Sequence, residues 1–166
     1  MAFIGILGGQ VLHSIEEYLL TFPVFLFLVP LMNDLGGNLG CVLASRVSSG
    51  FHSGYIEAHI KDKELTENMF ITLLMGLITF LTVALGVAVS SAVIDLGTTA
   101  LNLILVILGA GVITTVGTMI ITITVALISY KKRLDPDNIV IPVLTTLADL
   151  LSIISIFAMV WLVVIN

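Results

Sequence analysis

Long apolar runs separated by short polar segments dominate this chain. A helix that crosses a hydrocarbon core about 30 Å thick needs about 20 mainly apolar residues. Five runs approach or exceed this length, and they cover residues 2–20, 22–47, 69–94, 101–130 and 139–164. We therefore predict an all-α integral membrane protein with five transmembrane helices, in which residues 1–166 form a single domain.

Composition supports a membrane protein and excludes several function classes. The chain is 58% hydrophobic and only 10% charged, which is outside the range of soluble globular domains. The single cysteine, Cys41, excludes an internal disulfide and a cysteine-based metal cluster. The sequence contains no phosphate-binding loop, no nucleophile and base at workable spacing and no basic stripe for nucleic acid. We expect the protein to interact with the lipid bilayer and not with nucleic acid, and we expect no enzymatic activity.

Basic residues predict the orientation in the membrane. All six lie at or beyond the ends of the second and fourth runs: Arg46, Lys61, Lys63, Lys131, Lys132 and Arg133. The other two connections carry none. Because lysine and arginine are enriched in cytoplasmic loops, five spans place the N-terminus inside and the C-terminus outside. We expect a multi-pass protein of the plasma membrane.

Asp149 is the most informative residue of the last run. It lies about 10 residues into that run, which is about 15 Å deep at 1.5 Å per residue. A carboxylate there costs at least about 2.5–3.5 kcal/mol, so an ion or proton pathway is the first interpretation. Thr145 shares its helix face and Thr146 lies beside it, which gives one polar stripe. The alternative is a neutral Asp149 that hydrogen-bonds a neighbouring helix.

The second run contains residues that predict a broken helix. Pro30 removes a backbone donor, and the glycines of residues 36–40 weaken the helix further. Broken backbone at membrane depth is tolerated where it lines a cavity or is buried in protein. Asn33, Asp34 and Asn38 add side-chain oxygens, which suit hard cations such as Mg²⁺ or Ca²⁺. We expect a break at Gly-Gly-Asn that contributes oxygen ligands.

Small residues also permit a purely structural interpretation. Glycines let helices approach closely, so those of the second run could serve packing alone. In the fourth run, Gly111 and Thr115 form a small-xxx-small pair, and there we expect helix packing rather than ligand binding.

Two segments together resemble the MgtE family of magnesium transporters. Pro30-Leu31-Met32-Asn33-Asp34-Leu35-Gly36-Gly37-Asn38-Leu39-Gly40 is similar to the family's second membrane helix, where a proline and a spacer precede Gly-Gly-Asn-x-Gly. Asp135-Pro136-Asp137, followed by Pro142-Val143-Leu144-Thr145-Thr146-Leu147-Ala148-Asp149, is similar to the start of the fifth, where a Thr-Thr-x-x-Asp run supplies the pore carboxylate. Both segments fall at the expected places in a five-helix unit.

The resemblance implies a homodimer whose second and fifth helices line a cation path. Asp149 from each subunit would hold Mg²⁺, through waters that the ion retains. Asn38 and the carbonyl groups of Gly36 and Gly37 would be further, secondary ligands of the ion. From the residues themselves, Thr145, Thr146, Asp34 and Asn33 complete the expected metal-binding set.

The chain departs from the bacterial members, which carry a cytoplasmic regulatory part before the membrane unit. It resembles a minimal archaeal form, or one half of a tandem ten-span arrangement. Two alternatives stay open from the sequence. Asp34 could be the second site of a Na⁺- or H⁺-coupled Mg²⁺ exchanger, or the small chain could be a non-transporting subunit that assembles with a partner.

Overall fold

The computed structural model describes residues 2–14, 16, 20, 22–60, 62–94 and 96–165, and most of them are helical. No strand occurs within these ranges. The elements in chain order are α1 (Ala2–Ser14), α3 (Pro23–Ser53), α4 (Lys63–Ser90), α5 (Ala100–Lys131) and α6 (Pro136–Val160), which a π-helical segment, η1 (Trp161–Ile165), extends. The all-α prediction is confirmed.

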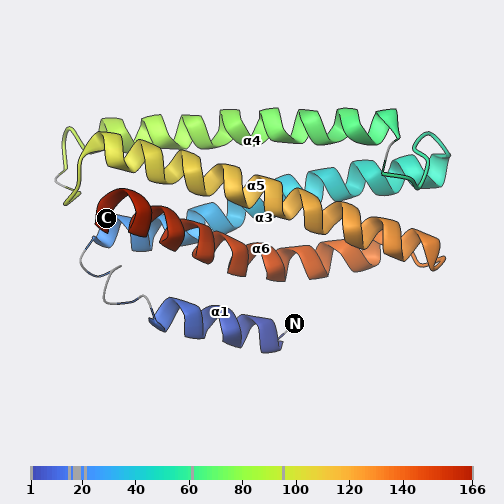
Figure 1. Ribbon diagram of the computed structural model, residues 1–166, viewed down its shortest axis with the longest axis horizontal. Coiled ribbons are helices and arrows are strands. Elements are labelled where there is room, and N and C mark those ends of the chain that lie inside the picture. The colour runs from blue at the N-terminus through green and yellow to red at the C-terminus, as the bar shows by residue number, and fades with distance from the viewer. Residues whose placement is uncertain are drawn as a thin grey trace.

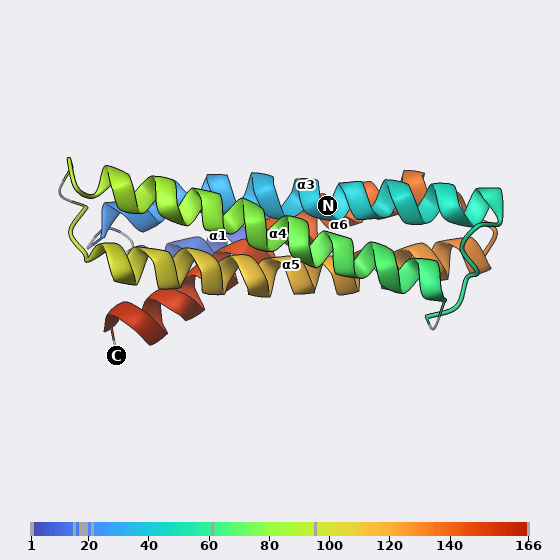
Figure 2. The same cartoon turned by 90° about the horizontal axis from the view of Figure 1, so that it is seen from above.

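Four long helices run side by side and form an elongated bundle. α3, α4, α5 and α6 alternate in direction, so the α3–α4 and α5–α6 connections share one end (Figure 1). α3 and α5 are central, because each of them contacts the other three long helices. The same alignment is visible from above, where the C-terminal part of α6 leaves the bundle axis (Figure 2). The shorter α1 contacts α6.

Four of the five predicted spans correspond to helices that are long and apolar enough to cross a membrane. These are α3, α4, α5 and the segment Asn138–Ile165, which includes most of α6 and η1. α1 has 13 residues, or about 20 Å at 1.5 Å per residue, which is short of a core about 30 Å thick. A first span over residues 2–20 stays a prediction, since residues 15 and 17–19 lie outside the described part of the chain.

The predicted break in the second span is not found. α3 is one helix from Pro23 to Ser53 and passes through Pro30 and the glycines without interruption. Helix propensity predicts costs of about 3 kcal/mol for proline and about 1 kcal/mol for glycine. Packing outweighs these local costs, because α3 buries Phe25, Leu28 and Met32 in the core and contacts both α5 and α6.

Close helix packing in the bundle depends on glycine. A β-carbon at Gly111 of α5 would overlap the ring of Phe80 on α4. A β-carbon at Gly76 of α4 would in turn lie 2.6 Å from Thr115 Oγ1 on α5. Each helix therefore places a side chain over a glycine of the other, which brings the two backbones together. The packing role expected for Gly111 and Thr115 agrees with this geometry.

Candidate functional site

Contacts between α3 and α6 fix the position of Asp149. The side chain of Leu144 lies over Gly40, where a β-carbon would come within 2.6 Å of Leu144 Cδ2. One turn beyond Asp149, Ser152 Oγ donates to the carbonyl oxygen of Ala148 at 2.8 Å and lies 3.4 Å from that of Met32. These two contacts hold α6 against α3 on either side of Asp149.

A polar hollow lies between the two helices at the level of Asp149. Its volume is about 180 Å³, and its lining consists of Asn33, Asp34, Gly37, Asn38, Cys41, Thr145 and Asp149. Residues more than 100 positions apart in sequence thus lie together. Six of the eight residues that the sequence analysis selected line this hollow: Asn33, Asp34, Gly37, Asn38, Thr145 and Asp149.

The other two selected residues, Gly36 and Thr146, are not part of the lining. Gly36 is buried on the opposite side of α3, where a β-carbon would overlap Thr114 Cγ2 of α5 and lie 3.5 Å from Ser152 Oγ. Thr146 Oγ1 donates to the carbonyl oxygen of Pro142 at 3.0 Å within α6. Thr145 Oγ1 donates to the same oxygen at 3.2 Å, so its hydrogen is used inside the helix while its oxygen remains an acceptor.

The oxygen atoms of the hollow lack protein partners that would neutralise them. No ion pair joins Asp34 or Asp149 to any residue of the described ranges. Asn33 Oδ1 is buried, and within the same ranges it accepts no hydrogen bond. An unpartnered buried amide oxygen costs about 1–3 kcal/mol. A small rotation of the Asn33 side chain toward the hollow would let this oxygen bind a water molecule or a cation and recover that cost.

The donor set is small and rich in oxygen. The described ranges contain no group of three or more His, Cys, Asp or Glu that could hold a metal ion. One chain therefore offers two carboxylates, Asp34 and Asp149, with the amides of Asn33 and Asn38 beside them. Carboxylate and amide oxygens suit hard divalent cations such as Mg²⁺.

Cys41 is the lining residue that the sequence analysis missed. As a single cysteine it excludes a disulfide and a cysteine-based metal cluster, and its sequence context did not mark it as part of a site. It lies seven residues after Asp34 and three after Asn38, and residues with this spacing share a helix face. Once α3 is taken as a continuous helix, that spacing is enough to place Cys41 in the hollow.

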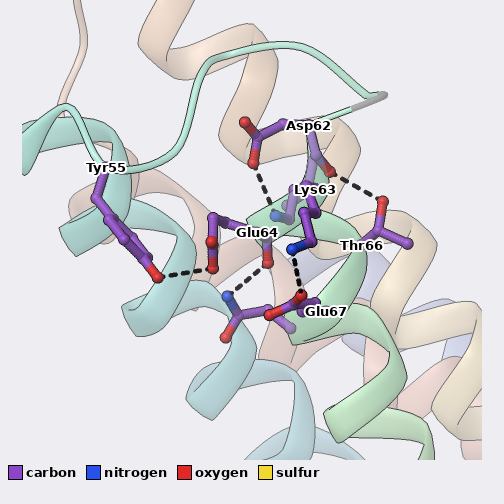
Figure 3. A network of polar contacts seen from close by, with 8 residues as sticks. Tyr55, Asp62, Lys63, Glu64, Thr66 and Glu67 are labelled. Atoms are coloured by element: carbon purple, nitrogen blue, oxygen red, sulfur yellow. Dashed lines mark hydrogen bonds and ion pairs between the residues drawn. The ribbon is translucent and has the colours of Figure 1, made fainter.

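A separate polar cluster joins α3 to α4 at the end of the bundle (Figure 3). Asp62 caps α4, since its Oδ1 accepts from the backbone N–H of Leu65 at 2.9 Å. Tyr55 donates to Glu64 Oε2 at 2.7 Å. This hydrogen bond and the negative charge of Glu64 raise the pKa of Tyr55. The cluster orders the connection and does not contribute to the hollow.

Comparison with models of protein families gives a match to MgtE, described as a divalent cation transporter, over residues 29–159. The matched segment begins within α3, includes α4 and α5, and ends one residue before the end of α6. Every residue that lines the hollow lies inside it. A search of curated proteins finds no match.

Proposed function

Because the chain belongs to the MgtE family of divalent cation transporters, we propose that it carries Mg²⁺ across the plasma membrane through the hollow between α3 and α6. The observation that carries this proposal is the gathering of Asp34 and Asp149 with two amide side chains in one hollow of membrane-spanning helices. Carboxylates within membrane spans are costly, and they mark ion pathways.

The size of the hollow fits a hydrated ion. A water molecule takes about 30 Å³ in the liquid, so about 180 Å³ corresponds to about six waters. Mg²⁺ is octahedral and loses its waters reluctantly. Asp149 then binds the ion through retained waters, with Asp34 beside it, while Asn33, Asn38 and Thr145 accept hydrogen bonds from the same waters.

Two copies of the chain complete the site. Asp34, Asn38 and Asp149 are all exposed in one chain, so the hollow is open on the side away from the core. A two-fold axis beside this face brings a second set of the same groups opposite the first. We propose a homodimer in which α3 and α6 of both subunits line the path and the two Asp149 carboxylates face each other.

The charge distribution supports an orientation in which the end of the bundle with the α3–α4 and α5–α6 connections lies in the cytoplasm. Lys63 begins α4 and Lys131 ends α5, followed by Lys132 and Arg133. These four residues lie in or directly beside the α3–α4 and α5–α6 connections, which share one end of the bundle (Figure 1). Lys61 lies outside the described residues. With a first span over residues 2–20, this orientation puts the N-terminus inside and the C-terminus outside.

Mg²⁺ uptake into proteoliposomes, followed by an indicator dye inside them, tests the role of Asp149. We expect Asp149→Asn to lower the flux about tenfold or more, because hydrogen bonds to charged groups contribute about 1.5–3 kcal/mol. Glu67→Gln is the matched control, since it removes an exposed carboxylate outside the hollow. Wild-type flux in Asp149→Asn at an unchanged oligomeric state would falsify the assignment.

Flux by the purified wild-type protein alone would also eliminate the hypothesis that the chain is a non-transporting assembly subunit.

Ion-coupled exchange is the second candidate function, because Asp34 supplies a second carboxylate to the same hollow. An exchanger predicts that imposed Na⁺ or H⁺ gradients drive Mg²⁺ uptake and that Asp34→Asn abolishes this drive. Mg²⁺ uptake that does not change with either gradient would exclude the exchanger and support uncoupled Mg²⁺ transport.

A further inference from the structure

Two hollows meet at Lys131, where α5 ends. The first has a volume of about 650 Å³, and its polar lining residues are His52, Tyr130, Lys131, Arg133 and Asp135. The second has a volume of about 390 Å³ and follows α5 beside α4, with Lys131 at one end of its lining. Neither hollow shares a residue with the hollow around Asp149.

The first hollow contains two basic side chains, and a hydrogen bond from Tyr130 to α3 holds its base in place. Lys131 and Arg133 line it, and in the described part of the chain neither forms an ion pair. Asp135 is the one carboxylate of the lining, and its Oδ2 accepts a hydrogen bond from Asn138 at 2.9 Å. Tyr130 donates to the carbonyl oxygen of Phe51 at 3.2 Å, which ties the base of the hollow to α3. Guanidinium and ammonium groups so placed suit a phosphate.

Arg133 occupies a backbone position that usually holds glycine. Its φ is 58°, in the left-handed region. The N–H of Arg133 donates to the carbonyl oxygen of Tyr130 at 2.9 Å, and that of Leu134 donates to Ser129 at 2.9 Å. This pair of bonds is a Schellman motif, where glycine avoids the strain of a β-carbon. An arginine at a strained position suggests a use for its guanidinium.

The second hollow is lined mainly by apolar side chains, with Thr124 and Lys131 as the exceptions, and has the length of a lipid chain. It extends along α5 from Ile120 to Lys131, which is about 16 Å at 1.5 Å per residue. One leaflet of a core about 30 Å thick has a similar depth. Ile120 is 59% exposed and Ile128 50% exposed, and Ile60 of the α3–α4 connection is 68% exposed at the same rim.

We propose that these joined hollows bind one anionic phospholipid of the leaflet on the basic side. Its phosphate lies on Lys131 and Arg133, and one acyl chain follows the groove along α5. A free phosphate would use the first hollow only, whereas a lipid uses both. The apolar groove that begins at the same lysine is the reason to assign the lipid.

Native mass spectrometry of the purified full chain, titrated with phosphatidylglycerol or phosphatidylcholine in detergent, tests the site. We expect tighter binding of phosphatidylglycerol and a loss of about fivefold in affinity for each basic residue removed, hence about 25-fold in Lys131→Gln/Arg133→Gly. Lys63→Gln, which removes a basic residue that lines neither hollow, should change nothing. Arg133→Gly relieves the strained position, so an unchanged or higher melting temperature excludes unfolding as the cause.

A groove variant separates a lipid from a free phosphate. Thr124→Phe fills the second hollow from an exposed position of α5 without changing charge, and we expect it to weaken phosphatidylglycerol binding as well. The proposal is overturned if both lipids bind equally, or if the double variant binds like the wild type. It is also overturned if Thr124→Phe has no effect while inorganic phosphate displaces the lipid, because the ligand is then a free phosphate.

Discussion

Gly36 and Gly37 are neighbours in sequence, but their surroundings predict opposite consequences of substitution. A β-carbon at Gly36 would overlap Thr114 Cγ2, whereas one at Gly37 would meet no other atom within 4 Å. We expect Gly36→Ala to destabilise the fold by about 1–3 kcal/mol, as overpacking does. Gly37→Ala should raise stability by up to about 1 kcal/mol through helix propensity and lower Mg²⁺ flux severalfold, because Gly37 lines the hollow. Equilibrium unfolding in mixed micelles and the proteoliposome assay measure the two effects.

Thr114→Ser provides the control for this pair. It removes the methyl group that Gly36→Ala would overlap, so the double variant should regain part of the lost stability. Equal stability of Gly36→Ala and Gly37→Ala would contradict the packing assigned to Gly36.

The raised pKa of Tyr55 predicts a measurable titration. Its hydroxyl donates to Glu64 and lies near the negative charges of Glu67 and Asp62, all of which favour the protonated form. The interaction is fully present below the ordinary tyrosine pKa of about 10 and is lost as the pH rises through the raised pKa of the folded protein. We expect the phenolate absorbance of the wild type minus Tyr55→Phe to show a midpoint above that of free tyrosine. Glu64→Gln should lower this midpoint, and an unchanged one would remove the assigned cause.

Individual residues of the candidate site were predictable where their chemistry is unusual for a membrane span. Asp149, Asp34 and Asn38 stand out by the cost of placing their side chains in hydrocarbon. Gly36 and Gly37 cannot be separated in this way, because a glycine in a pore and a glycine in a packing contact look alike in sequence. The distinction depends on Thr114, which is 78 residues away and meets Gly36 only after folding.

At the scale of helices, α4 and α5 depend on a reciprocal fit. Phe80 of α4 is 1% exposed and lies over Gly111 of α5. We predict that Gly111→Ala costs about 1–3 kcal/mol of stability and that Phe80→Leu in the same chain restores part of it. Gly86→Ala is the control on the open face of α4, where no atom lies within 4 Å. There, helix propensity predicts a gain of up to about 1 kcal/mol, and thermal unfolding in detergent compares the three variants.

The helices themselves were largely predictable, whereas the shape of α3 was not. Apolar runs of more than 20 residues leave little choice but a membrane helix. α5 and α6 follow their predicted ranges to within four residues, whereas α4 begins six residues before its predicted range. Pro30 and the glycines of residues 36–40 predicted a break that α3 does not have, because helix propensity takes only local effects into account. The contacts that keep α3 continuous come from α5 and α6, which a pattern along one helix does not reveal.

At the scale of the whole molecule, the proposed dimer makes a prediction for Cys41. It is the only cysteine of the chain and lines the open hollow. If α3 and α6 face the two-fold axis, the two Cys41 side chains lie near each other across it. A short bis-maleimide should then join wild-type protein into covalent dimers in membranes.

The control moves the thiol to a distant surface. Cys41→Ser combined with Ile78→Cys places it on α4, where Ile78 is 65% exposed. We expect this variant to stay monomeric on denaturing gels after the same treatment. Equal crosslinking of both variants, or none in the wild type, would count against the proposed two-fold axis.

α3 is the least apolar of the four candidate spans. It has the largest share of its most apolar stretch buried inside the bundle. It also carries Asn33, Asp34 and Asn38, whose side chains hydrocarbon alone does not satisfy. The helices that cover it are made later, since α6 is complete about 100 residues after α3, or about 5–20 s at the usual rate of synthesis. We expect the insertion machinery to shelter α3 during that interval, so that the helices enter the lipid together rather than one by one.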